Sequence, residues 1–197
     1  LQDVAGQTEL SAYCPQPWEM TGFCGRATFC HAGVLLAVEV LHQVPGLEDN
    51  PEEISVLVTT ATGIRLRVLH PIALCQSKLY NLRHFDQTQR QDRLHLEVSM
   101  AAAGRWLSEM LSTDPVGAIF FTNRWFRTVR VKGNLRTLLN HQLDWSQVVP
   151  IDALKGLISV QPRVATFLEQ QWPRMSSEIH GRSVELKSSP DPESPSQ

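Results

Sequence analysis

The sequence changes character at His70-Pro71, and this change constrains the fold more than any other feature. Before it, β-prone runs come in two pairs, Arg26 to His31 with Val34 to Val40 and Ile54 to Thr60 with Ile64 to Leu69. Each pair is joined by a short turn that contains glycine, which is typical of β-hairpins. After it, apolar residues recur at helical spacing, and proline suits the first position of a helix. We therefore expect an α+β protein that is strand-rich first and helical afterwards.

The second strand of each hairpin has its own pattern of apolar residues. Residues 34–41 are almost all apolar, which predicts a central strand covered on both faces. Residues 64–69 alternate instead, with apolar side chains on one face and Arg65 and Arg67 on the other. This alternation predicts one buried face and one basic face.

Four segments after His70 have helical patterns. We expect a helix that ends near His84, a long helix over about 92–112, a helix that starts at Asp114-Pro115 and breaks at Gly133 before 134–143, and a last helix over about 163–186. The apolar stripe of the long helix is expected to contain Leu94, Val98, Ala101, Ala102 and Leu107.

This organisation predicts three parts. Residues 1–85 form a strand-rich part, residues 86–187 form a helical part, and residues 188–197 are a tail rich in proline and serine that we expect to be disordered.

The composition limits the function classes. Of the 197 residues, 42% are hydrophobic, so a large core is expected, and the net charge of −2 gives no overall attraction for nucleic acid. Binding to an anionic partner must therefore depend on a local patch. The first residues have no basic segment followed by an apolar run, so we expect no secretion signal, and no run approaches the roughly 18 apolar residues of a membrane span. The four cysteines form no C-x-x-C motif, which favours free thiols and a cytoplasmic location.

Glu39 is the first candidate for a functional residue. It is a single acid inside the apolar run of residues 34–41. A buried carboxylate needs a partner or a metal ion, because burial of an isolated charge is costly. The alternative is a glutamate that faces an edge or forms a salt bridge.

Lys78 and Asp92 are the next candidates. Lys78 lies in the middle of the helix that follows His70-Pro71, close to its apolar stripe, and could reach a phosphate as a point charge. Alternatively, its amine extends to solvent. Asp92 stands at the start of the long helix, where its simplest role is a helix cap.

A basic stretch without acids is the third feature. No Asp or Glu occurs between residues 115 and 143, whereas Arg124, Arg127, Arg130, Lys132 and Arg136 all lie there. We expect the first three, spaced by three residues, to share one helical face that could neutralise phosphates. The alternative is a solvated face whose charges pair with acids elsewhere.

A family resemblance centres on residues 64–82, which read Ile-Arg-Leu-Arg-Val-Leu-His-Pro-Ile-Ala-Leu-Cys-Gln-Ser-Lys-Leu-Tyr-Asn-Leu. Together with Pro-Gln-Pro-Trp at 15–18, the segments 36–41 and 44–47, and Asp-Arg-Leu at 92–94, this text resembles nucleotidyltransferase-like proteins related to abortive-infection (type IV toxin–antitoxin) toxins. The resemblance covers about residues 10–112.

The resemblance implies a small mixed β-sheet with flanking helices, followed by a helical C-terminal extension. It also implies transfer of a nucleotide from a nucleoside triphosphate to an acceptor with Mg²⁺, and a cognate antitoxin protein as a partner. Glu39 then matches a catalytic acid that holds the metal, and Lys78 and Asp92 match nucleotide-binding residues. The family's Gly-Ser and Asp-x-Asp motif is expected before residue 1, so we expect this chain to be catalytically incomplete, either as a fragment or as an inactive member.

Two functions follow from these patterns. The first is nucleotide transfer by a nucleotidyltransferase-like protein or its C-terminal part. The alternative is a non-catalytic module that binds RNA or a protein through the basic helical surface 124–136, with Arg124, Arg127, Arg130 and Lys132 as the nucleic-acid-binding residues. A scaffold without a ligand is the third possibility.

Overall fold

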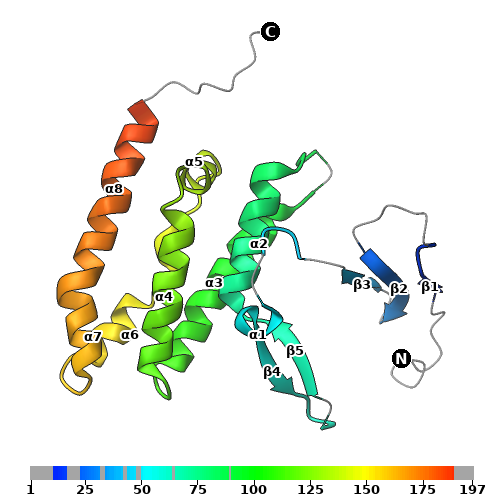
Figure 1. Cartoon of the computed structure of the whole chain (residues 1–197), viewed down its shortest axis with the longest axis horizontal. Helices are drawn as coiled ribbons and strands as arrows, with labels where there is room; N and C mark the ends of the chain where they lie inside the picture. The colour runs from blue at the N-terminus through cyan, green and yellow to red at the C-terminus, as the bar shows by residue number, and fades with distance from the viewer. Residues whose placement is uncertain are drawn as a thin grey trace. The chain divides into compact units, whose positions relative to one another are not determined.

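A computed structural model describes residues 11–16, 23–31, 34–41, 44–47, 50–63, 65–88 and 90–188 (Figure 1). The chain forms two compact units, Leu1–Pro45 and Gly46–Gln197. The predicted disordered tail lies, apart from Ser188, outside the described residues. The second hairpin belongs to the same unit as the helices, so the compact units divide the chain well before residue 85.

The first unit contains a three-stranded antiparallel sheet with the order β1-β2-β3, formed by β1 (Ser11–Tyr13), β2 (Phe23–His31) and β3 (Val34–Leu41). The central strand is β2, and β3 pairs with β2 alone among the described strands. The prediction that the apolar run 34–41 is a central strand is therefore wrong for this sheet. A continuous apolar pattern is typical of a strand covered on both faces, but it does not by itself say how many strands pair with it.

The second unit begins with a short helix, α1 (Pro51–Ile54), that leads into the hairpin of β4 (Ser55–Thr59) and β5 (Arg65–Leu69). Asn50 caps α1, because its Oδ1 atom accepts a hydrogen bond from the Glu52 amide at 3.1 Å. Gly63 in the turn has a φ of +83°, which only glycine adopts at little cost. Both described sheets are antiparallel, so the expected mixed sheet is absent from the described part of the chain.

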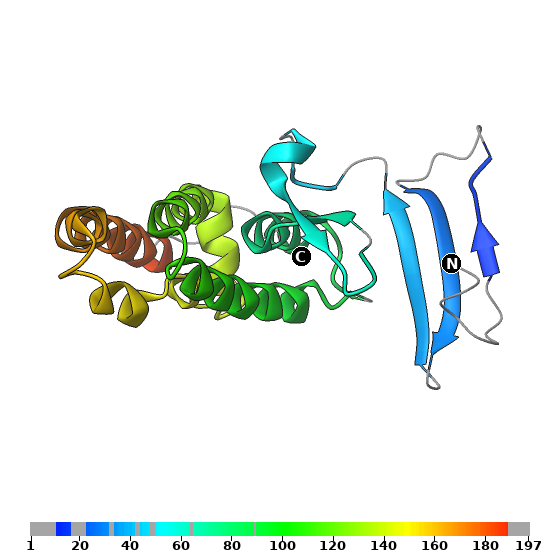
Figure 2. The same cartoon turned by 90° about the horizontal axis from the view of Figure 1, so that it is seen from below.

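Helices make up the rest of the second unit. Their bounds are α2 (Pro71–His84), α3 (Asp92–Met110), α4 (Pro115–Val129), α5 (Lys132–Asn140), the 3₁₀ turn η1 (Trp145–Val148), α6 (Ile151–Gly156), α7 (Pro162–Thr166), the π-helical segment η2 (Phe167–Gln171) and α8 (Trp172–Ser188). Within this unit, α8 and the β4–β5 hairpin lie at opposite ends, with α2, α3 and α4 between them (Figures 1 and 2).

His70 connects the hairpin to the helices. Its imidazole Nδ1 atom caps α2 by accepting a hydrogen bond from the Ala73 amide at 3.0 Å, so Nε2 carries the proton and donates to the Glu53 carbonyl at 3.2 Å. The ring is 1% exposed and stacks on Trp106 with the ring centroids 6.0 Å apart. The predicted switch to helix at His70-Pro71 is thus confirmed, and its histidine is a buried structural residue.

The core of the second unit gathers large apolar side chains from most of its helices, including Ile72, Leu79, Leu96, Met100, Leu107, Trp125, Leu138 and Phe167. The predicted stripe of α3 is wrong except at Leu107, because Leu94 and Val98 are 51% and 60% exposed. The helix has a second stripe at the same spacing, and the face with Leu96 and Met100 is the one that packs against the core.

The predicted break at Gly133 lies a few residues too late. Helix α4 ends at Val129, and Gly133 lies inside α5. A Cβ atom at Gly133 would lie 2.3 Å from Cζ of Arg83, so this glycine makes room for a neighbouring guanidinium. Among the described helices, none is long and apolar enough to cross a membrane.

Candidate functional site

The predicted site residues fall into both compact units. Glu39 lies in β3 of the first unit, where its register partner on β2 is Arg26. Lys78 in α2 and Asp92 at the start of α3 belong to the second unit. A site shared by Glu39 and Lys78 stays a prediction.

Lys78 and Asp92 meet where α2 and α3 pack together. The Lys78 Nζ atom lies 3.9 Å from Asp92 Oδ1, and the Arg90 guanidinium binds the other carboxylate oxygen, Oδ2. Gln87 adds a hydrogen bond from Nε2 to Oδ2 at 3.5 Å. The Asp92 side chain is 3% exposed and that of Lys78 is 27% exposed. Lys78 thus stays partly accessible beside a carboxylate that two cations neutralise.

The electrostatics of Asp92 follow from these contacts. Burial acts to raise the pKa of the carboxyl group, but the hydrogen bond and charge of Arg90 and the charge of Lys78 outweigh it, and the pKa lies below its usual range. The N-cap of α3 is Gln91, and no side chain makes a capping bond there. Asp92 therefore connects α2, the loop at Arg90 and α3, and it is not the helix cap that its position suggested.

A Mg²⁺ site is implied by the family resemblance and needs several oxygen ligands. In the described part of the chain, no group of three or more His, Cys, Asp or Glu side chains is placed to hold a metal ion. Both oxygens of Asp92 are already bound by cations. The described residues therefore do not fit a Mg²⁺ site by themselves.

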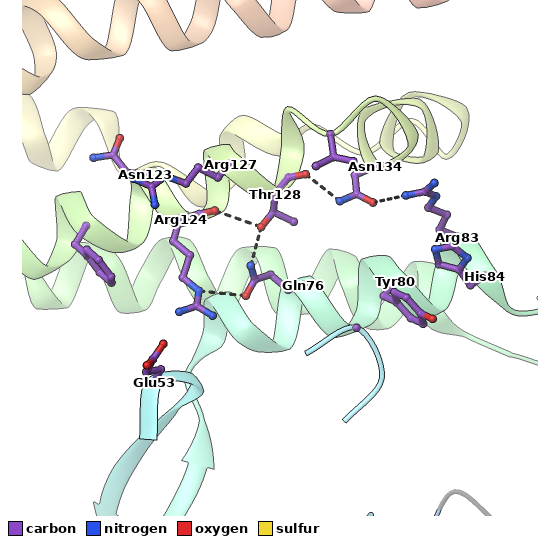
Figure 3. Close-up of a pocket in the computed structure, with 13 residues that line it drawn as sticks. Glu53, Gln76, Tyr80, Arg83, His84, Asn123, Arg124, Arg127, Thr128 and Asn134 are labelled. Carbon is purple, nitrogen blue, oxygen red and sulfur yellow. Dashed lines mark hydrogen bonds between the residues drawn. The ribbon is translucent and has the colours of Figure 1, made fainter. Parts of the chain in front are cut away.

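A separate cleft of about 740 Å³ lies along α2, α4 and the start of α5 (Figure 3). We call it the basic cleft, because Arg83, Arg124 and Arg127 line it. Its α2 side is built from Gln76, Tyr80 and Arg83, at positions i, i+4 and i+7, which share one helical face. Lys78 lies about 200° around the helix from Gln76. The basic cleft and the Lys78–Asp92 pair thus use opposite sides of α2.

The floor of the basic cleft is a chain of polar contacts between helices. Gln76 donates from Nε2 to the Thr128 hydroxyl at 2.7 Å, and its Oε1 atom accepts from Arg124 Nε at 3.3 Å. Asn134 on α5 donates from Nδ2 to the Thr128 carbonyl at 2.9 Å. These bonds connect α2, α4 and α5 along the cleft (Figure 3).

Arg83 is positioned by α5. Its guanidinium lies against the backbone of Gly133, and Nη1 donates to Asn134 Oδ1 at 3.4 Å. Helix α5 starts at this point without a side-chain hydrogen bond at its N-cap, Val131. The positive end of a helix and a held guanidinium therefore face the same end of the cleft.

The arginines of α4 are divided between two hollows. Arg124 and Arg127 line the basic cleft, whereas Arg127 and Arg130 line a second hollow of about 300 Å³ together with Arg174 of α8. Steps of three residues turn a helix by about 300°, so Arg130 is rotated by about 120° from Arg124. The three arginines therefore lie within an arc of about 120° and line two hollows rather than one.

Lys132 lies in neither of these hollows. It lines a third one, of about 330 Å³, with Leu135 of α5 and Arg182 of α8. Arg83, Tyr80 and His84 were not among the predicted site residues, because helical spacing places them on the far side of the helix from Lys78. The signal that could have found them is their spacing from Gln76 on one polar face.

The described lining of the basic cleft contains one carboxylate. Glu53 of α1 is the only carboxylate among the described lining residues, and it lies on the same side as Arg124 (Figure 3). Three arginines and one glutamate leave an excess of two positive charges. Arg127 is exposed and forms no ion pair with any described residue. The cleft is thus suited to an anion.

No protein-family model, curated protein sequence or solved structure was found to match this chain.

Proposed function

We propose that the second unit binds RNA through the basic cleft. The observation that supports this most directly is the convergence of Arg83, Arg124 and Arg127, from two helices, on one cleft of about 740 Å³. Phosphate groups are the anions that arginine binds best through paired N–H groups. Exposed rings at Tyr80 and Phe120, which are 39% and 57% exposed, lie in the same cleft and suit nucleobases.

Charge supports RNA over a weakly charged partner. The acid-free stretch 115–143 supplies arginines to two neighbouring hollows, with Arg127 lining both. A linear polyanion can follow such a surface, because its phosphates recur along the chain. The whole chain has a net charge of −2, so attraction of a polyanion depends on a local surface such as this one.

The test is binding of a fluorescently labelled single-stranded RNA, measured by anisotropy as salt is raised. We compare the wild type with Arg124→Gln/Arg127→Gln, and with a control of equal charge change, Arg105→Gln/Arg163→Gln, whose residues line none of the three hollows. The first pair should weaken binding and reduce the slope of log K against log salt by about 1.4, from about 0.7 per lost phosphate contact. The control pair should change the slope much less.

Two results would reject the proposal. One is an absence of binding at low salt. The other is equal weakening by the two double variants, which would indicate diffuse attraction rather than a site. Competition by a polyglutamate peptide at equal charge concentration would favour an acidic protein as the partner, because a peptide has charge but no bases.

Nucleotide transfer, the activity of the proteins that the chain resembles, is the second candidate. One observation favours it: Lys78 and Asp92, matched separately by the resemblance, lie 3.9 Å apart in space. Lys78 would bind a phosphate of the triphosphate through its partly exposed amine. A fluorescent nucleoside triphosphate should then bind to the whole chain and lose affinity on Lys78→Gln but not on Lys155→Gln. Equal affinity of the two variants, or an absence of binding, would reject this candidate.

A further inference from the structure

We infer that the RNA in the basic cleft is single-stranded, with an unpaired base against the Tyr80–His84 ring pair and a neighbouring phosphate on Arg83. This inference rests on the proposed function and goes further, because it names the kind of RNA and the part of the cleft that distinguishes it. Tyr80, Arg83 and His84 come from the last turns of one helix, so a ring surface and a guanidinium are presented side by side (Figure 3).

The ring pair is supported from within the protein. The centroids of Tyr80 and His84 lie 4.3 Å apart with an angle of 34° between the rings, and Phe85 meets Tyr80 edge-on at 6.2 Å. Gly46 also lies against Tyr80, since a Cβ atom there would come within 2.4 Å of the Tyr80 Cβ. Its φ of +77° also favours glycine. Contacts on several sides hold Tyr80 in one orientation, while 39% of the residue stays exposed.

The guanidinium beside these rings is also held in place. Gly133 leaves the space in which the Arg83 guanidinium lies, and Asn134 accepts one of its hydrogen bonds. Arginine has five N–H donors, so others remain for a phosphate. A ring surface next to an exposed guanidinium matches the two parts of a nucleotide, a flat base and a charged phosphate.

A duplex cannot use both features at once. In double-stranded RNA the bases are stacked inside the helix, and proteins reach mainly the phosphates and the 2′-hydroxyl groups. A duplex could therefore contact Arg83 and Arg127, but it has no free base face for Tyr80. Single-stranded RNA gains base stacking in addition to the charge contacts, and single-stranded binding sites typically combine the two.

The experiment compares a single-stranded RNA of about ten nucleotides with a hairpin duplex of the same composition. Binding is followed by anisotropy, and stacking by the fluorescence of 2-aminopurine in the single strand. Wild-type protein should bind the single strand more tightly and quench the 2-aminopurine. Tyr80→Leu should weaken binding of the single strand by about 5- to 150-fold, the usual effect of losing one stacked base. Tyr80→Phe should retain binding, and both variants should leave the duplex affinity unchanged.

A second variant guards against misfolding of Tyr80→Leu. His84 is exposed at the end of α2, so His84→Ala removes ring surface with little effect on the fold. It should weaken binding of the single strand and reduce the quenching of 2-aminopurine. Equal affinity for single strand and duplex, with no effect of Tyr80→Leu or His84→Ala, would overturn the inference. If Arg127→Gln still weakened binding of both RNAs, the proposed function would stand without the inference about single-stranded RNA. If neither RNA bound, both would fall.

Discussion

The substitution Gly133→Ala should separate the stability of the protein from its affinity for RNA. Alanine favours a helix over glycine by about 1 kcal/mol, and Gly133 lies within α5. The added Cβ would meet the Arg83 guanidinium at 2.3 Å from Cζ and 2.5 Å from Nη2. These atoms are the far end of a flexible side chain, so Arg83 can move away at little cost. We expect the free energy of unfolding to stay the same or to rise by up to about 1 kcal/mol.

The affinity for RNA should change in the opposite direction. A displaced Arg83 loses the support of the α5 backbone and its hydrogen bond to Asn134. A hydrogen bond to a charged group contributes about 1.5–3 kcal/mol. Loss of one Arg83–phosphate contact should therefore weaken binding by about 10- to 150-fold. Urea unfolding gives the stability, and anisotropy with single-stranded RNA gives the affinity.

Arg83→Gln is the matched comparison. It removes the same guanidinium without touching α5, so Gly133→Ala and Arg83→Gln should weaken RNA binding to a similar extent. Their combination should be no worse than either alone, because both act on one group. A Gly133→Ala protein that binds RNA like the wild type would refute the reasoning. So would a loss of stability above about 1 kcal/mol, which would mean that Arg83 cannot move aside.

Three further predictions concern other contacts. Gly104→Ala should destabilise the protein by about 1–3 kcal/mol in urea unfolding, because a Cβ there would lie 2.5 Å from the backbone oxygen of Gln147, which cannot rotate away; an unchanged midpoint would contradict this. Glu53→Gln should strengthen RNA binding about two- to fivefold at low salt and leave it unchanged at high salt, because it removes the carboxylate from the basic cleft; weaker binding would indicate that Glu53 positions Arg124 instead. Asp92→Asn should lower the free energy of unfolding at neutral pH by about 1–3 kcal/mol. Because the pKa of Asp92 is lowered in the folded protein, its contribution is present above the unfolded value near 4 and is lost as the pH falls through the folded pKa, so the variant and the wild type should converge in acid.

Local sequence signals predicted where two helices of the second unit begin. Asp114 before Pro115 caps α4, and His70 before Pro71 caps α2. Each of these depends on a side chain and a backbone amide two or three residues away, so the sequence contains both partners.

Roles that depend on contacts with distant residues could not be predicted from the local sequence. The face of α3 that packs inward is decided by the helices beside it, and the sequence offers two stripes of similar spacing. Gly133 looked like a helix breaker, whereas its role depends on Arg83, fifty residues earlier in the chain. Asp92 looked like a cap, but Arg90 and Lys78 bind its carboxylate. In each case the deciding contact comes from another element or from the loop beside it.

The arginine-rich stretch has two interpretations, a surface that binds phosphates and a solvated face whose charges pair with acids elsewhere. The charged residues around it bear on both. If acids from other elements neutralised it, each hollow would contain as many carboxylates as arginines. The basic cleft has Glu53 against three arginines, and the second hollow has Glu178 against Arg127, Arg130 and Arg174. Glu178 is itself bound by Arg182 at 2.9 Å. Among the described lining residues, both hollows therefore contain more arginines than carboxylates, and Arg127 lines both. An anion that occupies one hollow lowers the electrostatic cost of keeping these arginines close together, which is the physical reason to expect a ligand here rather than a solvated surface.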